Sequence, residues 1–171
     1  MSFPSLSSWR AMEYTDLPHV YKCAERLFPD HHEEYACFVR RWEWGRDFCM
    51  VLPSVRPDQI DGYLVAYPWP YGSVPPLNQV LPFCPQSHGW LYLSDLAVEK
   101  SAPGGQGKAA VATLVSEARD AGCAGIALVA VNHSESFWRR QGFASQDAGA
   151  LPAGALMHYG EDAVYMVLDG V

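Results

Sequence analysis

The clearest pattern of apolar and polar positions lies between residues 90 and 122. The run WLYLSDLAVEK is largely apolar, with Ser94 and Asp95 as a polar pair inside it, and predicts a mostly buried strand. After a glycine-rich turn, apolar residues recur at helical spacing: Val111, Leu114, Val115 and Ala118. This spacing predicts a helix that begins at about Gly107 or Lys108 and lays one apolar face on a sheet.

The rest of the chain adds elements on both sides of this segment. Before it, the pattern predicts strands at 9–12, 48–52 and 60–66 and helices at 16–27 and 32–44. After it, we expect a buried strand at 126–131, a short helix at 135–141 and a last strand at 163–168. A chain of 171 residues suits one domain, residues 1–171, without a second core.

Composition narrows the class of protein. A hydrophobic fraction of 49% with 13% aromatic and 18% charged residues favours a packed globule over disorder. No apolar run approaches the ~20 residues of a membrane helix, and the start MSFPSLSSWR lacks a signal pattern, so we expect a cytoplasmic protein with no membrane partner. The net charge of −7 argues against nucleic acid as a partner and weakly favours cationic substrates.

Cysteines and histidines give no metal-binding pattern. The five cysteines are scattered without a C-x-x-C motif, so we expect reduced thiols rather than disulfides or a zinc site. Residues 31–34, His-His-Glu-Glu, are adjacent and would be spread around a helix start, where acids suit the helix dipole. We therefore expect no metal.

The turn before the 107–121 helix has the features of an anion site. A helix start leaves unpaired N–H groups and a positive dipole end, and glycines let a phosphate approach the backbone. A P-loop is disfavoured, because Ala102 and Ala109 stand where it needs Gly and Ser or Thr. Residues 105–110 satisfy the dinucleotide fingerprint formally, but the next strand ends at Asn132 instead of at an acidic residue.

Two segments together resemble the GCN5-related N-acetyltransferase (GNAT) superfamily, of bacterial type. Residues 104–109, GGQGKA, are similar to its Q/R-x-x-G-x-G/A segment, with Gly104 where Gln or Arg is usual. Residues 126–143, IALVAVNHSESFWRRQGF, resemble its strand, splayed Asn and short helix, with Trp138 where the family has Tyr. The resemblance implies an α/β (α+β) fold with a mixed sheet of about six or seven strands, about four helices, and a splay between the fourth and fifth strands.

The resemblance also implies acetyl-CoA as cosubstrate and a primary amine of a small molecule or peptide as acceptor. The expected cofactor-binding residues lie on the central strand, the glycine turn and the second segment: Leu96, Ala97, Val98, Gly104, Gly105, Gln106, Gly107, Lys108, Ala109, Asn132, Ser136, Phe137, Trp138 and Arg140. The amide of Ala97 or Leu96 would form a small oxyanion hole for the thioester carbonyl. Asn132 would contact the pantetheine arm, or else be a strand-end turn residue.

Acetylation of an amine requires a proton acceptor, because only the neutral amine attacks. Asp95 lies two residues before Ala97 and therefore on the same face of the strand, with Glu99 farther along. His133 is another candidate, since its unperturbed pKa lies nearer the working pH. We prefer Asp95 as the base; the alternative is that it only orders the neighbouring loop. Trp138 cannot serve as the proton donor, and Tyr159 is a substitute candidate.

Residues 68–89, PWPYGSVPPLNQVLPFCPQSHG, form an unusual proline-rich and aromatic segment. Prolines forbid regular structure there, and Trp69, Tyr71, Leu77, Leu81 and Phe83 would be unfavourable in water. We expect the segment either to fold over the sheet as a wall of the acceptor pocket or to pack on the body without touching substrate.

Two other functions stay open on the same fold. The missing family Tyr is compatible with a catalytically weak module that binds or senses acyl-CoA. An acyltransferase that uses another acyl-CoA or a hydroxyl acceptor is the second alternative. The sequence leaves the oligomeric state open between a monomer and a homodimer.

Overall fold

A computed structural model of the chain describes residues 8–171; residues 1–7, and with them most of the segment examined for a signal pattern, lie outside the described part. The strands are β1 (Arg10–Ala11), β2 (Met50–Pro53), β3 (Ile60–Pro68), β4 (Trp90–Val98), β5 (Gly125–Ala130), β6 (Ala144–Ser145) and β7 (Val164–Asp169). The helices are α1 (Leu17–Leu27), α2 (Tyr35–Trp44), α3 (Gln106–Asp120) and α4 (Glu135–Arg140), with short 3₁₀ turns at Tyr14–Asp16 and Ala148–Ala150.

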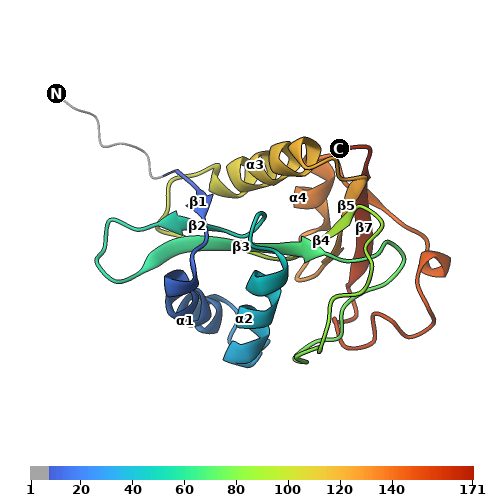
Figure 1. The fold of residues 1–171 in the computed structure, drawn as a ribbon, viewed down its shortest axis with the longest axis horizontal. Coiled ribbons are helices and arrows are strands. Elements are labelled where there is room, and N and C mark those ends of the chain that lie inside the picture. The colour runs from blue at the N-terminus through green and yellow to red at the C-terminus, as the bar shows by residue number, and fades with distance from the viewer. Residues whose placement is uncertain (1–7) are drawn as a thin grey trace.

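The strands form one mixed sheet in the order β1-β2-β3-β4-β5-β7-β6. Neighbouring strands are antiparallel except β4 and β5, which run parallel. Helices α1 and α2 cover one face, and α3 and α4 cover the other (Figure 1). The expected mixed sheet with its flanking helices is confirmed.

Each face of the sheet has its own core. On the α1–α2 face, Tyr63, Val65 and Tyr67 of β3 are at most 2% exposed. On the α3–α4 face, the alternate residues Leu64 and Ala66 of β3 are fully buried. Because β3 is covered on both faces, its sequence is apolar almost throughout instead of alternating.

A close backbone approach fixes the end of α2. A Cβ on Gly45 would lie 1.9 Å from the carbonyl oxygen of Ala66 in β3, so only glycine fits at this position. The N–H of Gly45 also donates to Arg41 O at 2.9 Å and closes the helix. The close approach of β3 therefore determines where α2 stops.

Two expectations about the chain need correction. The second helix begins at Tyr35 instead of residue 32, because residues 31–34 bend toward the proline segment (residues 68–89). Within the proline segment, Trp69 is buried at 5% exposure and stacks on Trp44, but Phe83 is 75% exposed. The segment contains no helix or strand between the end of β3 at Pro68 and the start of β4 at Trp90, as its prolines predicted.

None of the helices in residues 8–171 combines the length and apolar character needed to cross a membrane.

Candidate active site

The parallel strands β4 and β5 separate partway along their length. They pair only at Trp90–Gly125, Leu91–Ile126 and Tyr92–Ala127. Beyond this point β4 continues beside β3 to Val98, and β5 continues beside β7 to Ala130. The predicted splay between the fourth and fifth strands is confirmed, and it leaves one edge of β4 without a strand partner.

A bulge in β4 sits at the point of separation. Asp95 is opposite Val65 and Leu93 is opposite Ala66, so Ser94 has no partner on β3. A bulge residue changes which face the following side chains point to. Tyr92 and Ala97 consequently both pack on the α1–α2 face although five positions separate them, and Asp95 shares that face with Ala97.

Backbone N–H groups along β4 point alternately toward β3 and away from it. Those that point away from β3 face the cleft between β4 and β5. The N–H of Glu99 donates to Asp61 O at 2.7 Å, toward β3. In an antiparallel pair, alternate residues exchange hydrogen bonds with the same neighbour, so the Ala97 amide also points to β3. Leu96 and Val98 therefore direct their N–H and C=O groups into the cleft. Of the two amides expected there, that of Ala97 or that of Leu96, the strand register favours Leu96.

The start of α3 presents unpaired donors. Gly105 precedes the helix with φ +85°, a left-handed conformation that glycine adopts without strain. The first helical hydrogen bond runs from Ala109 N–H to Gly105 O at 3.0 Å. The N–H groups of Gln106, Gly107 and Lys108 therefore have no intrahelical partner and point out of the helix end, a ready anion site.

Gly107 lets the start of α3 pack closely against α4. A Cβ at Gly107 would lie 3.3 Å from the Phe137 ring and 4.0 Å from Leu96, so the glycine permits tight packing. Trp138 is 8% exposed and packs edge-on against Phe137 and Phe143. Asn132 follows β5 with φ +53°, as a strand-end turn residue.

The charged residues around α3 and α4 fall into two groups. Arg139 is bound to Glu135 at 2.6 Å. Arg140 has no ion-pair partner within residues 8–171, and with Lys108 it borders a hollow of about 410 Å³ between α3, α4 and the chain end. Arg140, the arginine expected to bind the cofactor, is therefore not engaged in an ion pair among these residues. The remaining expected residue, Ser136, is exposed.

The splay opens into a cavity of about 530 Å³. The α3 side of the cavity is lined by Leu96, Val98, Gly107, Asn132, Phe137 and Trp138. The α1–α2 side is lined by Phe28, Phe38, Tyr63, Leu77, Tyr92 and Asp95, among others. Ala97, Ser136, Arg140 and the other residues of the glycine turn do not line it. The structure thus gathers seven of the expected site residues around one cavity.

Asp95 faces this cavity without a bound partner. Its carboxylate makes no hydrogen bond or ion pair with another residue in the described part of the chain. Burial raises the pKa of Asp95 from 3.8 to about 6; Arg41 opposes the shift and Glu33 adds to it. The carboxylate is thus mostly ionised at neutral pH, with a pKa close to the range that suits a general base.

The other candidates for the base lie elsewhere. Glu99 accepts hydrogen bonds from Arg26 at 2.7 and 3.0 Å and is not part of the cavity lining. The side chain of His133 is 91% exposed beside Asp162, whose carboxylate accepts the His133 backbone N–H at 2.7 Å. Neither group is directed toward the splay, so Asp95 is the candidate that the geometry favours.

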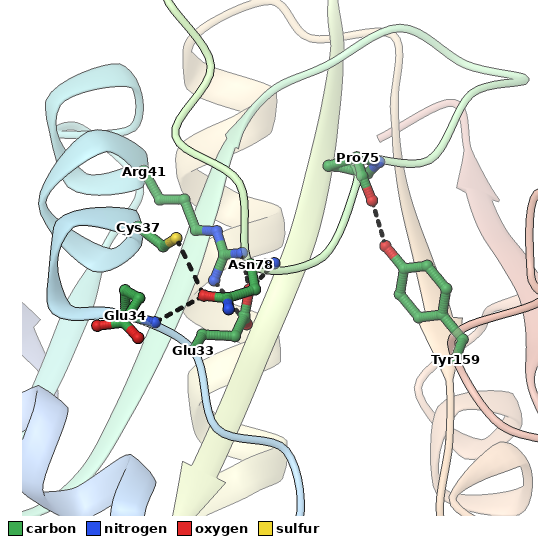
Figure 2. A network of polar contacts seen from close by, with 7 residues as sticks. All are labelled: Glu33, Glu34, Cys37, Arg41, Pro75, Asn78 and Tyr159. Carbon is green, nitrogen blue, oxygen red and sulfur yellow. Dashed lines mark hydrogen bonds and ion pairs between the residues drawn. The ribbon is translucent and has the colours of Figure 1, made fainter.

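A polar network beside Asp95 ties the proline segment to α2 (Figure 2). Glu33 binds the guanidinium of Arg41 through both carboxylate oxygens and accepts the N–H of Asn78 at 2.8 Å. The Asn78 side-chain oxygen accepts the N–H of Glu34 at 2.8 Å. Arg41 is 7% exposed, and its pairing with the carboxylate lowers the pKa of Glu33 despite burial.

The sequence pattern does not reveal this network, because the adjacency of residues 31–34 predicts only acids around a helix start. One signal was present. Arg41 lies three residues after Phe38 on the apolar stripe of α2, where a charge needs a buried partner. The sequence could have indicated a buried ion pair, but not that its acid would come from residue 33.

Tyr159 holds the proline segment at a second point, Pro75. Its hydroxyl donates to Pro75 O at 2.5 Å (Figure 2). Tyr159 and Tyr92 both line the cavity. Burial raises the pKa of Tyr159, so the phenol stays protonated. Its proton is engaged with the Pro75 carbonyl, which weakens the case for Tyr159 as a proton donor.

The comparisons with known proteins agree with this architecture. The Acetyltransferase (GNAT) family model matches residues 8–143, so the chain belongs to the GNAT acetyltransferase family. No curated protein sequence matches the chain.

Solved structures with a similar fold are numerous. Ard1 from Thermoplasma volcanium superposes with a TM-score of 0.69 at 14% identity, covering 98% of this chain and 99% of that one. The ribosomal-protein-S18-alanine N-acetyltransferase from Escherichia coli gives 0.64 at 19% identity, over 95% and 92%. A GNAT family acetyltransferase from Brucella melitensis, solved in complex with acetyl-CoA, gives 0.62 at 17% identity, over 95% and 87%.

Proposed function

We propose that this protein transfers an acetyl group from acetyl-CoA to a primary amine by direct attack. The observation that carries the proposal is one cavity in which three features meet. These are the unpaired edge of β4, the open start of α3 and the unpartnered carboxylate of Asp95. Such a site can hold a nucleotide thioester and accept a proton from the attacking group.

The residues around the α3 side fit the shape and charge of coenzyme A. The N–H groups of Gln106, Gly107 and Lys108 would hold the pyrophosphate, and the absence of a Cβ at Gly107 keeps the approach open. The backbone of Leu96 and Val98 would pair with the amides of the pantetheine arm. Arg140 would meet a phosphate at the nucleotide end. Acetyl-CoA would supply an activated acetyl thioester at the splay.

The chain's own groups would then serve the transfer. The Leu96 N–H, aimed into the cleft, would stabilise negative charge that develops on the carbonyl oxygen. Asp95 would accept the proton of the ammonium, directly or through water, and its raised pKa suits that task. Trp138 would wall the cleft, since an indole N–H does not titrate usefully. The leaving thiol has an ordinary pKa near ~8.5, so transfer does not require a strong acid.

The experiment that tests the proposal measures coenzyme A binding and free thiol release separately. Calorimetry with coenzyme A should show binding, and release of free thiol from acetyl-CoA should depend on an added amine. Mass spectrometry of the acceptor should show the mass of one acetyl group. Absence of coenzyme A binding by the folded protein would refute the proposal.

Trp138 in place of the family Tyr favours one second candidate, a module that binds acyl-CoA without turnover. That function is distinguished by coenzyme A binding with no thiol release for any acceptor. An enzyme for another acyl donor would release thiol faster from longer or polar acyl-CoA thioesters than from acetyl-CoA.

A further inference from the structure

We propose that the acceptor is a primary amine on an apolar, aromatic-sized body that carries no carboxylate. It would bind in the α1–α2 side of the cavity with its nitrogen at Asp95. This inference rests on the proposed acetyl transfer and names the class of acceptor for that same site.

Aromatic side chains form much of the α1–α2 side. Phe38, Tyr63 and Tyr92 are each at most 4% exposed, and Phe28 and Leu77 also belong to the lining. Aromatic side chains of this kind bind an apolar body by burial of area and by ring contacts. The rings themselves would give a highly hydrated acceptor no hydrogen-bond partners for the water it loses against them.

The polar groups in this wall match an ammonium. Tyr63 lies diagonally across the β3–β4 pair from Asp95, on the same face of the sheet. The hydroxyls of Tyr63 and Ser94 are buried and have no hydrogen-bond partner within residues 8–171. Buried hydroxyls without partners are rare and call for a ligand or water. An ammonium has three donors and no acceptor, and could serve the carboxylate and both hydroxyls.

The same side offers no lysine or arginine to a carboxylate, since none belongs to the cavity lining in the described part of the chain. Arg41 lies close behind, but both of its terminal nitrogens are bound to Glu33. Three histidines belong to the lining: His31, His32 and His158. The carboxylate of Glu34 lies 3.7 Å from His32 and adds negative charge there. An amino-acid acceptor would therefore place its carboxylate near Asp95 without a cationic partner.

The proline segment limits the length of the acceptor. Asn78 is bound to Glu33 and Glu34, and Pro75 is bound to Tyr159, so the segment is held at two places across the cavity. The volume of about 530 Å³ would also have to admit the pantetheine arm. The space left suits a small molecule better than an extended peptide.

A matched series of acceptors tests the proposal. Thiol release from acetyl-CoA would be measured with phenethylamine, with phenylalanine, and with phenylalaninamide, which restores neutrality at the carboxylate position. A pentapeptide with a free N-terminal phenylalanine would complete the series. We expect kcat/KM for phenethylamine to exceed that for phenylalanine by roughly a hundredfold, because a buried charge without a partner is rejected strongly. Phenylalaninamide should recover most of the loss.

Two tyrosine variants test the assigned position. Y63F removes the hydroxyl beside Asp95 and should raise KM for phenethylamine roughly tenfold with little change in kcat. Y71F removes the hydroxyl of an exposed tyrosine that donates to Gln146 and does not line the cavity. It should leave KM unchanged. Calorimetric titration of phenethylamine into the protein saturated with coenzyme A gives the same comparison without turnover.

The outcomes separate this inference from the proposed function. Thiol release that is fastest with phenylalanine or with the peptide would overturn the acceptor class while acetyl transfer stands. Coenzyme A binding with no phenethylamine binding and no turnover would also overturn it. Failure to bind coenzyme A at all would remove the proposed function and this inference together.

Discussion

The two sides of the cavity are built from different parts of the polypeptide. The α3 side relies on backbone groups, namely the open helix start at residues 106–108 and the unpaired edge of β4. The α1–α2 side relies on side chains from α1, α2, β3, β4 and the proline segment. In the proposed function, backbone groups would hold the cosubstrate, whereas side chains would select the acceptor and accept its proton. Five predictions sharpen this division, beginning with the largest effect.

The first prediction concerns the proton acceptor on the α1–α2 side. D95N should lower kcat/KM at neutral pH by roughly 10²- to 10⁴-fold, the usual loss for a general base, with unchanged affinity for coenzyme A. In the wild type, kcat/KM should fall as pH drops below about 6, because protonated Asp95 cannot accept a proton. The variant should lack this limb of the pH profile.

The groups around Asp95 must be considered in that profile. Arg41, Glu33, Tyr63, Tyr67, Tyr92, Tyr159 and Cys49 all interact electrostatically with it or with each other. The tyrosines and Cys49 have raised pKa values and stay neutral near pH 6. A folded D95N protein with near-normal kcat/KM at neutral pH would show that Asp95 is not the base.

The second prediction concerns the α3 side. G107E should weaken coenzyme A binding roughly a hundredfold or more, since the side chain adds a negative charge at the phosphate site and crowds Phe137. G149E is the matched control, because a Cβ at Gly149 has no neighbour within 4 Å and lies outside the cavity lining. Calorimetry that gives equal affinities for the two folded variants would refute the assigned phosphate site.

The third prediction tests the anchor of the proline segment. E33Q leaves the buried Arg41 without a charged partner and should cost about 3 kcal/mol in the free energy of unfolding. Removal of the negative charge should also lower the pKa of Asp95, so the acidic limb of the pH profile moves to lower pH. E34Q is the control, since the Glu34 side chain is 70% exposed. Chemical denaturation and pH profiles measure both effects, and coincident curves for the two variants would contradict the anchor.

The fourth prediction concerns the stability of the D95N protein, which should rise although its activity falls. The pKa of Asp95 is higher in the folded protein than its ordinary value of 3.8, so the folded state binds the proton more tightly. This contribution to stability is present at low pH and is lost as pH rises from 3.8 to about 6. D95N removes the buried charge and should stabilise the protein at pH 7 by about 1 to 2 kcal/mol, allowing for partial exposure to the cavity. Equal or lower stability by chemical denaturation at pH 7 would contradict the burial of a charge there.

The fifth and smallest effect is expected at Trp138, on the α3 side of the cavity. W138F keeps an aromatic ring against Phe137 and Phe143 and should retain kcat within about tenfold, because loss of a packing contact costs about 1 kcal/mol. Coenzyme A affinity should be nearly unchanged. A large loss of kcat at constant coenzyme A affinity would show a direct part in proton transfer.

Local sequence patterns were sufficient to predict the α3 side. Gly105, Gly107 and the following apolar stripe are local, and a local pattern suffices because a helix start and a strand edge present the same backbone groups whatever surrounds them. The order of strands and helices and the splay could likewise be predicted from periodicity and from the resemblance. Asp95 could be nominated, since it is the acid inside an otherwise apolar strand.

The α1–α2 side could not be predicted from local sequence patterns. The bulge at Ser94 assigns Asp95 and Tyr92 to one face, and sequence alternation alone would have placed them on opposite faces. The pairing of Glu33 with Arg41 and Asn78 joins residues up to 45 positions apart, and no local pattern encodes such a distance. The raised pKa of Asp95 has the same origin, because burial and neighbouring charges arise only when distant segments pack together.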